Sequence, residues 1–413
     1  MSQTAAPPRS ALAQFLVVLG PGLVVMLADT DVGSVITAAQ SGTQWGYRLL
    51  ALQIVLIPVL YLVQELTVRL GIFTGKGHGE LIAEIFGKFW AFVSVGGLSV
   101  ATTGALLTEF SGVAGVSDLY GVPRLAGVAL AAAILLVVVW TGSYVRVERI
   151  ALALGAFELV FFGIAWASHP EIGALARDVT NMPLHDHNYL TLTAANIGAV
   201  IMPWMVFYQQ SAVADKGLRP EEYQAARWDT AIGAVVTQLI MAAVLIAAAA
   251  TLGRLNPNAK LDTVQELSHA ITPYLGDTWG RAVYSVGILG AGMVAAIVAS
   301  LAGAWGWGEV TGFHHSLAHH PREAPWFYGV FTLITVAGAL IVVVIPDLVT
   351  LDIAVEVMNA LLLPLVLGFL VMLAVKALPR DHRLRGGYLW LVVIVTALTT
   401  ALGVYGGLIS LAG

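Results

Sequence analysis

The chain has 413 residues, of which 58% are hydrophobic and 11% are charged, and its formal net charge at pH 7 is −5. Soluble domains carry about 25% charged residues, so this composition excludes an ordinary soluble protein and predicts an integral membrane protein. The absence of cysteine excludes disulfides, thiolate metal sites and cysteine nucleophiles, and no basic stripe suggests nucleic acid as a partner.

Apolar stretches of about 20 residues, the length that crosses a bilayer, recur eleven times along the chain. They are predicted at 12–40, 47–70, 90–117, 123–142, 148–168, 190–213, 228–252, 279–307, 326–345, 352–376 and 388–411. The expected fold class is therefore an all-α polytopic membrane protein. No small-residue cleavage site follows the first apolar run, so we expect no cleaved signal peptide.

The lysines and arginines predict which side of the membrane each loop faces. With the N-terminus in the cytoplasm, the inner segments hold 14 of the 20 basic residues. Because short cytoplasmic loops are enriched in lysine and arginine, we expect a cytoplasmic N-terminus and an extracytoplasmic C-terminus. The expected location is the inner (plasma) membrane of a prokaryotic-type cell.

The first predicted span contains two carboxylates, Asp29 and Asp31, followed closely by Gly33. An ionised side chain near the bilayer centre costs at least a few kcal/mol, so such residues face a partner, a cavity or an ion pathway. Glycine weakens the helix here, and a broken helix at this depth is tolerated only where the freed backbone lines a cavity or is buried in protein. We therefore predict an interrupted helix, with Gly33 as its hinge, beside a pocket that suits a desolvated cation.

A second interruption is predicted in the sixth span, at Pro203. Proline removes a backbone hydrogen bond, so carbonyl groups near Ala199 are freed. A simple proline kink is the alternative interpretation. The position favours a functional break, because two repeats of five spans would place interruptions in the first and sixth spans, and paired broken helices indicate a transport site.

Few other ionisable residues fall inside the predicted spans. They are Glu109 in the third, Glu158 in the fifth and Glu356 in the tenth. A functional role is favoured for Glu109 and Glu356, which cannot easily reach water. Four more charged residues lie nearer span ends, where a side chain can snorkel to water, and a structural or interfacial role is expected for them: Glu65, Arg69, Asp229 and Asp352.

Two predicted loops carry most of the histidines. The outer loop at 169–188 also holds two aspartates, and the inner loop lies at 313–322. Clustered His and Asp can gather metal ions, but a solvated loop with chance histidines is the favoured interpretation of both. No histidine falls inside a predicted span, so we expect no histidine proton relay in the membrane.

The residues around both interruptions resemble the Nramp family of divalent-metal transporters. Asp31-Val32-Gly33-Ser34 resembles that family's Asp-Pro-Gly-Asn motif, and residues 38–47 look like its continuation. Residues 64–76 are similar to the end of the family's second span, and 198–203 match its sixth-span Gly-Ala-Thr-Val-Met-Pro. The resemblance covers spans 1 to 10 and implies a LeuT-type fold, with two inverted five-helix repeats plus an eleventh helix, that works by alternating access.

That fold implies a division of the chain into five parts. They are a cytoplasmic N-terminal tail at 1–11, a first inverted repeat at 12–168, an extracellular loop at 169–189, a second inverted repeat at 190–376, and a cytoplasmic loop with the last span at 377–413.

Carried over position by position, the resemblance implies an ion site made by Asp31, Ser34, the Ala199 carbonyl and the Met202 thioether. Ser34 stands where the family has Asn and is a shorter oxygen ligand. Oxygen ligands suit Mg²⁺ and Mn²⁺, whereas a thioether favours Mn²⁺, Fe²⁺ or Cd²⁺ over Ca²⁺. Core packing is the alternative role for Met202. Glu356 falls where the family's tenth span carries a Gln that helps to close around the ion.

The departures from the family pattern concern its proton route. Leu106, Trp204 and Gln209 replace one Asp and two His of that route, Glu109 is its remnant, and the ninth span lacks an arginine pair. Such losses resemble the Nramp-related branch associated with Mg²⁺, in which proton coupling is absent and the ion is bound partly hydrated. Asp29, in place of the family's usual Tyr, also suits a hydrated ion. Retention of the methionine points instead to the metal-selective branch.

The resulting prediction is a secondary transporter of divalent metal ions, Mn²⁺ first and Mg²⁺ a close second, with weak or absent proton coupling. A LeuT-type carrier for an amino acid or other organic solute, or a non-transporting metal sensor, are the alternatives. The chain has no Ser/His/Asp set, no His-Glu-x-x-His and no phosphate loop, so we do not expect an enzyme. The transported ion and the lipid bilayer are the expected partners, no cofactor is expected, and the oligomeric state is left open.

Overall fold

The regular structure of the described residues is helical throughout. A computed structural model describes residues 20–412 except 179, 256–260, 262–265 and 269–271, and it assigns no strand to them. The predicted tail at 1–11 and the first residues of span 1 lie outside this part. Within it, nine helical segments are long and apolar enough to cross a membrane, and a bent pair of helices makes a tenth. One further apolar helix, Arg124–Val139, is shorter, and with it each of the eleven predicted spans has its counterpart.

The helices follow one another along the chain with short connections. In order they are α2 Pro21–Asp29, α3 Val32–Trp45, α4 Leu50–Thr74, α5 His78–Phe86, α6 Lys88–Leu119, α7 Arg124–Val139, α8 Tyr144–Gly155, the 3₁₀ segment η1 Ala156–Leu159, α9 Val160–Ala167, α10 Ile172–Asp178, α11 His187–Val200, α12 Pro203–Lys216, η2 Pro220–Glu222, α13 Tyr223–Ala250, α14 Leu252–Leu255, η3 Pro273–Leu275, α16 Gly276–Thr311, α17 Pro325–Val343, α18 Leu348–Lys376 and α19 Gly386–Ala412.

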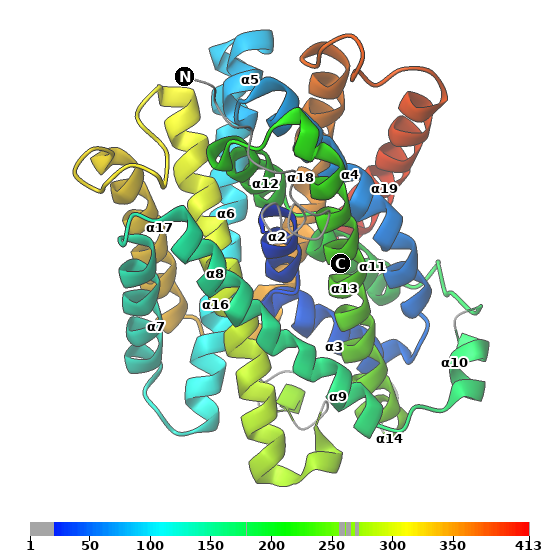
Figure 1. Cartoon of the computed structure of the whole chain (residues 1–413). Coiled ribbons are helices and arrows are strands. Elements are labelled where there is room, and N and C mark those ends of the chain that lie inside the picture. The colour runs from blue at the N-terminus through cyan, green and yellow to red at the C-terminus, as the bar shows by residue number, and fades with distance from the viewer. Residues whose placement is uncertain (1–19, 179, 256–260, 262–265, 269–271, 413) are drawn as a thin grey trace, which may run out of the picture.

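The short helix α2 lies at the centre of the bundle (Figure 1). It packs against α8, α12, α13 and α16. The span made by α11 and α12 is also enclosed, since 94% of its most apolar window is buried. Helices at the periphery instead leave large apolar side chains exposed, such as Val137 of α7, Leu333 of α17 and Leu398 of α19. Lipid tails are the environment that suits such a surface.

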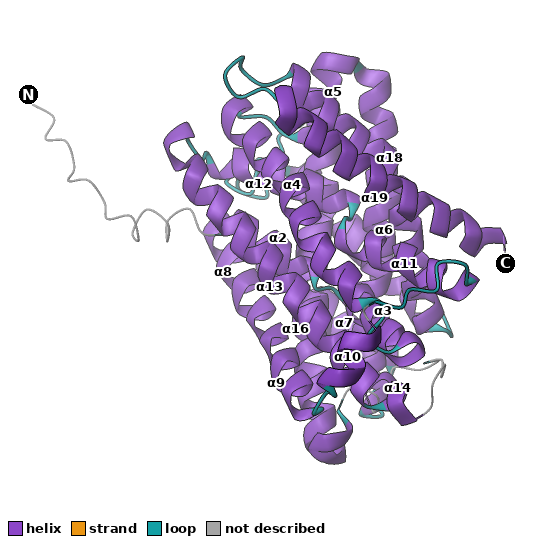
Figure 2. Cartoon of the chain, turned by 90° about the vertical axis from the view of Figure 1, so that its right-hand side faces the viewer, coloured by secondary structure: helices purple, strands orange, loops and turns teal. Residues whose placement is uncertain are grey.

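The long helices run side by side, and the two connecting helices α5 and α10 lie at opposite ends of the molecule (Figure 2). That placement agrees with loops on opposite faces of a membrane. Which end faces the cytoplasm stays a prediction that rests on the basic residues.

Close approach of two backbones holds α11 against α18. A Cβ atom added at Gly198 of α11 would collide with the backbone carbonyl of Glu356 in α18. Small residues at such contacts let transmembrane helices pack closely, because dispersion forces replace the hydrophobic effect between helices in lipid. Gly198 therefore fixes the distance between the sixth and tenth spans.

We expect Gly198→Ala to destabilise the protein by about 1–3 kcal/mol, the usual cost of overpacking a tight contact. Gly163→Ala in α9 is the matched control, because a Cβ there meets nothing within 4 Å. Thermal unfolding of the detergent-purified proteins measures both. A Gly198→Ala midpoint equal to that of the control would contradict the close contact.

Candidate functional site

The first span is interrupted at Thr30 and Asp31. Helix α2 ends at Asp29, α3 begins at Val32, and their axes differ by 46°. Asp31 caps α3, because its Oδ1 accepts a hydrogen bond from the Ser34 backbone N–H at 2.7 Å. A carboxylate in this position satisfies an amide that the helix start leaves unpaired.

Gly33 is not the hinge that the sequence suggested. It is the second residue of α3 and lies after the break. A Cβ added to it would collide with Oε1 of Glu356, so the carboxylate of Glu356 lies directly against the Gly33 backbone. The glycine is needed for this close approach of an acidic side chain, whereas the bend itself is at Thr30 and Asp31.

The sixth span is interrupted where its proline predicts. Helix α11 ends at Val200, and α12 begins at Pro203. Proline has no backbone N–H, so the Ala199 carbonyl four residues earlier has no helical donor. The Ser34 hydroxyl donates to that carbonyl at 3.0 Å. A hydrogen bond thus joins the two broken helices, one from each predicted repeat.

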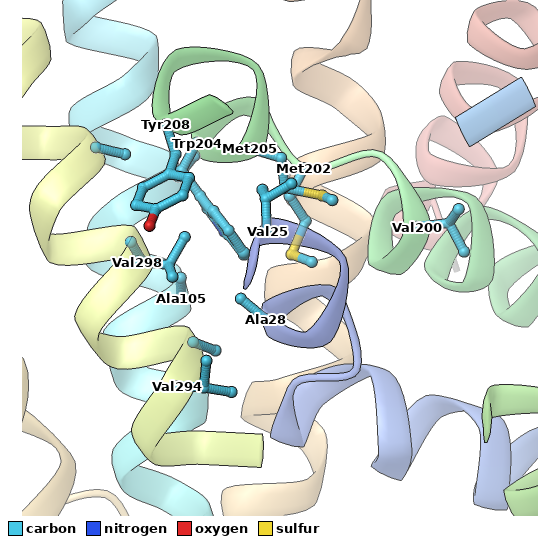
Figure 3. Packing of buried hydrophobic residues seen from close by; sticks show 14 of the residues in the cluster. Val25, Ala28, Ala105, Val200, Met202, Trp204, Met205, Tyr208, Val294 and Val298 are labelled. Atoms are coloured by element: carbon cyan, nitrogen blue, oxygen red, sulfur yellow. The ribbon is translucent and has the colours of Figure 1, made fainter. Parts of the chain in front are cut away.

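Met202 lies at the second break, directly before α12, and is fully buried. Figure 3 shows it with Met205 in a cluster of apolar side chains that includes Val25 and Ala28 of α2. The thioether is therefore packed between the two interrupted spans. This placement suits both a packing role and a soft ligand, and its role as a ligand stays a prediction.

Three acidic side chains from three helices meet around the first break. Glu109 of α6 accepts the Val32 backbone N–H at 3.2 Å, and its carboxyl group interacts electrostatically with that of Asp31. Glu356 accepts a hydrogen bond from Asn359 Nδ2 at 3.0 Å. Oδ2 of Asp31 and Oε1 of Glu356 are buried and have no hydrogen-bond partner among the described residues. Because a buried acceptor without a partner costs about 1–3 kcal/mol, and more when charged, these two oxygens suit a cation.

Asn359 is a site residue that the sequence analysis missed. Its side chain is fully buried, and in the part of the chain that the structure describes its Oδ1 has no hydrogen-bond partner. The available signal is its spacing, because residues three apart share one face of a helix and Asn359 follows Glu356 by three. An amide oxygen beside the acidic group is a further neutral ligand for a hard cation.

Asp29 does not join these residues. Its Oδ2 lies 3.5 Å from the Thr237 hydroxyl and 3.4 Å from the Gln238 side-chain nitrogen, and both residues belong to α13. The hydrogen bonds of Asp29 therefore do not place it among the residues around Asp31, and a shared ion stays a prediction. The break gives the two carboxylates different neighbours, because Asp29 approaches α13 whereas Asp31 caps α3.

The three substituted positions of the proton route are buried and lack titratable side chains. Leu106 packs against Gly338, and Trp204 is fully buried. Gln209 accepts a hydrogen bond from Thr67 at 3.0 Å and donates one to Thr230 at 2.9 Å. The amide of Gln209 therefore ties α12 to α4 and α13, which is a structural role.

The three acids near the span ends are buried and do not reach water, and their contacts agree with the structural role expected for them. Asp229 accepts backbone N–H groups at the start of α2, from Gly22 at 2.9 Å and Leu23 at 3.2 Å. Asp352 accepts a hydrogen bond from Ser111, and Glu65 pairs with Arg69 at 2.8 Å. Each of these acids has a structural partner.

The histidine-bearing loops show no metal centre. Across the described residues, no three His, Asp or Glu side chains are placed to hold a metal ion together. In the outer loop, Asp186 caps α11, and Asp178 accepts the Tyr47 N–H. Burial lowers the pKa of His78, in the connecting helix α5, to about 4, so its ring is neutral at pH 7. The candidate site therefore rests on few carboxylates with neutral ligands.

Most of the chain is similar to known proteins. The model of the natural resistance-associated macrophage protein-like family, Nramp, matches residues 22–408. A protein named divalent metal cation transporter MntH, from Yersinia pestis (strain Pestoides F), is 30% identical over 301 residues, which are 70% of this chain and 71% of the relative. Its counterpart from Pectobacterium carotovorum is 28% identical over 302 residues, with the same coverage of both chains.

Two solved structures show a fold similar to that of this chain. The manganese transporter of Eremococcus coleocola superposes with a TM-score of 0.77 at 19% identity, covering 99% of this chain and 89% of its own. The structure of MhsT with L-phenylalanine superposes with a TM-score of 0.63 at 12% identity, covering 97% and 98%. At these identities the likeness concerns the fold, and it confirms the LeuT-type architecture.

The contact between Gly33 and Glu356 predicts a coupled pair of substitutions. Gly33→Ala alone displaces the Glu356 carboxylate and lowers stability, whereas in a Glu356→Ala background the new methyl enters freed space. We expect a favourable interaction free energy of about 1–2 kcal/mol in this double-mutant cycle, as for residues in direct contact. Thermal or chemical unfolding of the four proteins measures it, and additive effects would contradict the contact.

Proposed function

The chain belongs to the Nramp family, and we propose that it is a secondary transporter that moves divalent metal ions across the membrane by alternating access. The observation that carries the proposal is the buried Asp31 carboxylate at the junction of two broken helices. Its Oδ2 has no hydrogen-bond partner among the described residues. The Ala199 carbonyl at the second break has no helical donor, because Pro203 has no backbone N–H. Irregular backbone at membrane depth that offers oxygens to an ion is typical of secondary transporters.

We propose Mn²⁺ as the first substrate and Mg²⁺ as the second. Asp31, Ser34 and the Ala199 carbonyl supply oxygen ligands, which both ions accept. Met202, buried at the same junction, is a soft ligand and supports Mn²⁺ over Mg²⁺. The acidic surroundings oppose an organic substrate with a carboxylate, because Asp31, Glu109 and Glu356 would repel it.

Weak or absent proton coupling is part of the proposal. Leu106 and Trp204 cannot carry a proton, and both polar ends of the Gln209 amide already have partners. Among the positions compared with the family's proton route, Glu109 alone is ionisable. Its carboxylate accepts a hydrogen bond from the Val32 backbone N–H at the first break. Glu109 is therefore proposed to support the backbone of the site instead of passing protons through a chain of titratable groups.

Asp31→Ala is expected to reduce Mn²⁺ uptake into proteoliposomes at least about tenfold, because it removes the charged ligand. Asp352→Asn is the matched control, since it neutralises another buried carboxyl group, which accepts a hydrogen bond from Ser111. Full transport by Asp31→Ala would overturn the assignment. Metal binding without any flux in the native chain would favour a sensor, and flux of an amino acid would favour an organic-solute carrier.

The internal pH of the same proteoliposomes is expected to stay constant while Mn²⁺ enters. A pH-sensitive dye trapped inside the vesicles reports it, and vesicles with the Asp31→Ala variant give the background leak. Acidification that tracks metal entry and disappears in that variant would contradict weak coupling while leaving metal transport intact.

A further inference from the structure

A second group of buried oxygen atoms lies at the C-terminal end of α2. Asp29 is 1% exposed and Glu158 is 0% exposed. Within the described ranges, Oδ1 of Asp29 and both carboxylate oxygens of Glu158 lack a well-formed hydrogen bond, and so does Oε1 of Gln238. Thr30 is the polar neighbour of Glu158, and its hydroxyl lies 2.6 Å from that of Thr237. Asp29 thus approaches the Thr237 hydroxyl and the Gln238 amide, and Glu158 lies by Thr30, whose hydroxyl contacts that of Thr237.

The fold turns Glu158 inward from a segment that otherwise faces lipid. The fifth span tightens into the 3₁₀ segment η1 at this point. The flanking Phe157 and Leu159 are 49% and 48% exposed, whereas Glu158 is fully buried. Gly155 permits the approach, because a Cβ there would press on Leu27 of α2 at 2.7 Å. A stretch of 3₁₀ within a helix often marks a functional position.

Among the described residues, no basic side chain compensates the charge of this group. The charged groups that act on Glu158 are Asp31 and, to a lesser extent, Asp29, which are both acidic. Asp29 is also the last residue of α2, where the helix dipole adds partial negative charge. Burying a carboxylate without a positive partner is costly, so a charged pair here needs a bound cation.

We propose that Asp29 and Glu158, with the Thr30 and Thr237 hydroxyls and the Gln238 amide, form a second cation site distinct from that at Asp31. Every polar atom that it offers as a ligand is an oxygen or belongs to an amide that can present one, and Met202 lies instead at the second break. The site therefore takes a hard cation, and Mg²⁺ and Na⁺ are the two candidate ions. It does not depend on transport of metal at Asp31.

The test measures Mg²⁺ and Na⁺ binding, in separate titrations, to the full-length chain carrying Asp31→Ala. This background removes the charged ligand of the first site. We expect one hard cation per chain to bind this protein, and we expect addition of Glu158→Gln to weaken that binding at least tenfold. Addition of Asp352→Asn is the matched control and is expected to leave it unchanged.

Absence of binding of both ions to the Asp31→Ala chain, or equal binding with and without Glu158→Gln, would overturn the second site. If the Asp31→Ala chain fails to fold, Glu158→Gln is made alone. It is then expected to lower the number of bound hard cations from two to one without changing the affinity for Mn²⁺, and an unchanged number would overturn the proposal. If the native chain takes up no Mn²⁺ but still binds a hard cation at the second site, the result counts against the proposed function only.

Discussion

The hydrogen bond from the Ser34 hydroxyl to the Ala199 carbonyl joins the two interrupted spans on which the candidate site depends. It exists because Pro203 cannot donate to that carbonyl, and because the first span breaks at Thr30 and Asp31, directly before α3, which carries Ser34. In a bilayer, freed backbone groups must find partners inside the protein. The first break thus supplies the donor that the second break lacks.

Helix α13 holds the half-helix α2 in position at both ends. Asp229 of α13 accepts backbone amides at the start of α2, and Thr237 and Gln238 approach Asp29 at its end. A short helix in the middle of a bundle has few turns of its own, so its placement depends on such contacts. The acidic side chains around the break are therefore set by the packing of α13 and not by α2 alone.

Much of this could be predicted from the sequence, because long apolar runs, buried carboxylates and a mid-span proline have direct physical consequences. The eleven spans and both interrupted helices follow from them. The directions of the side chains could not be predicted, since Asp29 and Asp31 are close in sequence but lie on either side of a bend. Asp229 has its role only because the neighbouring helix α2 places its first backbone amides against it. The role of Gly33 could not be predicted, because glycine suits both a bend in a helix and a close approach of another group to the backbone.

The central claim is that two broken helices meet at mid-membrane and present oxygen atoms to a divalent cation. Anomalous diffraction from crystals soaked with Mn²⁺ tests it most directly. The account predicts a metal peak about 2.0–2.6 Å from an Asp31 oxygen, between the first and second breaks. A continuous helix through positions 29 to 34 with Asp31 directed away from α11, or a metal peak only elsewhere in the chain, would contradict it.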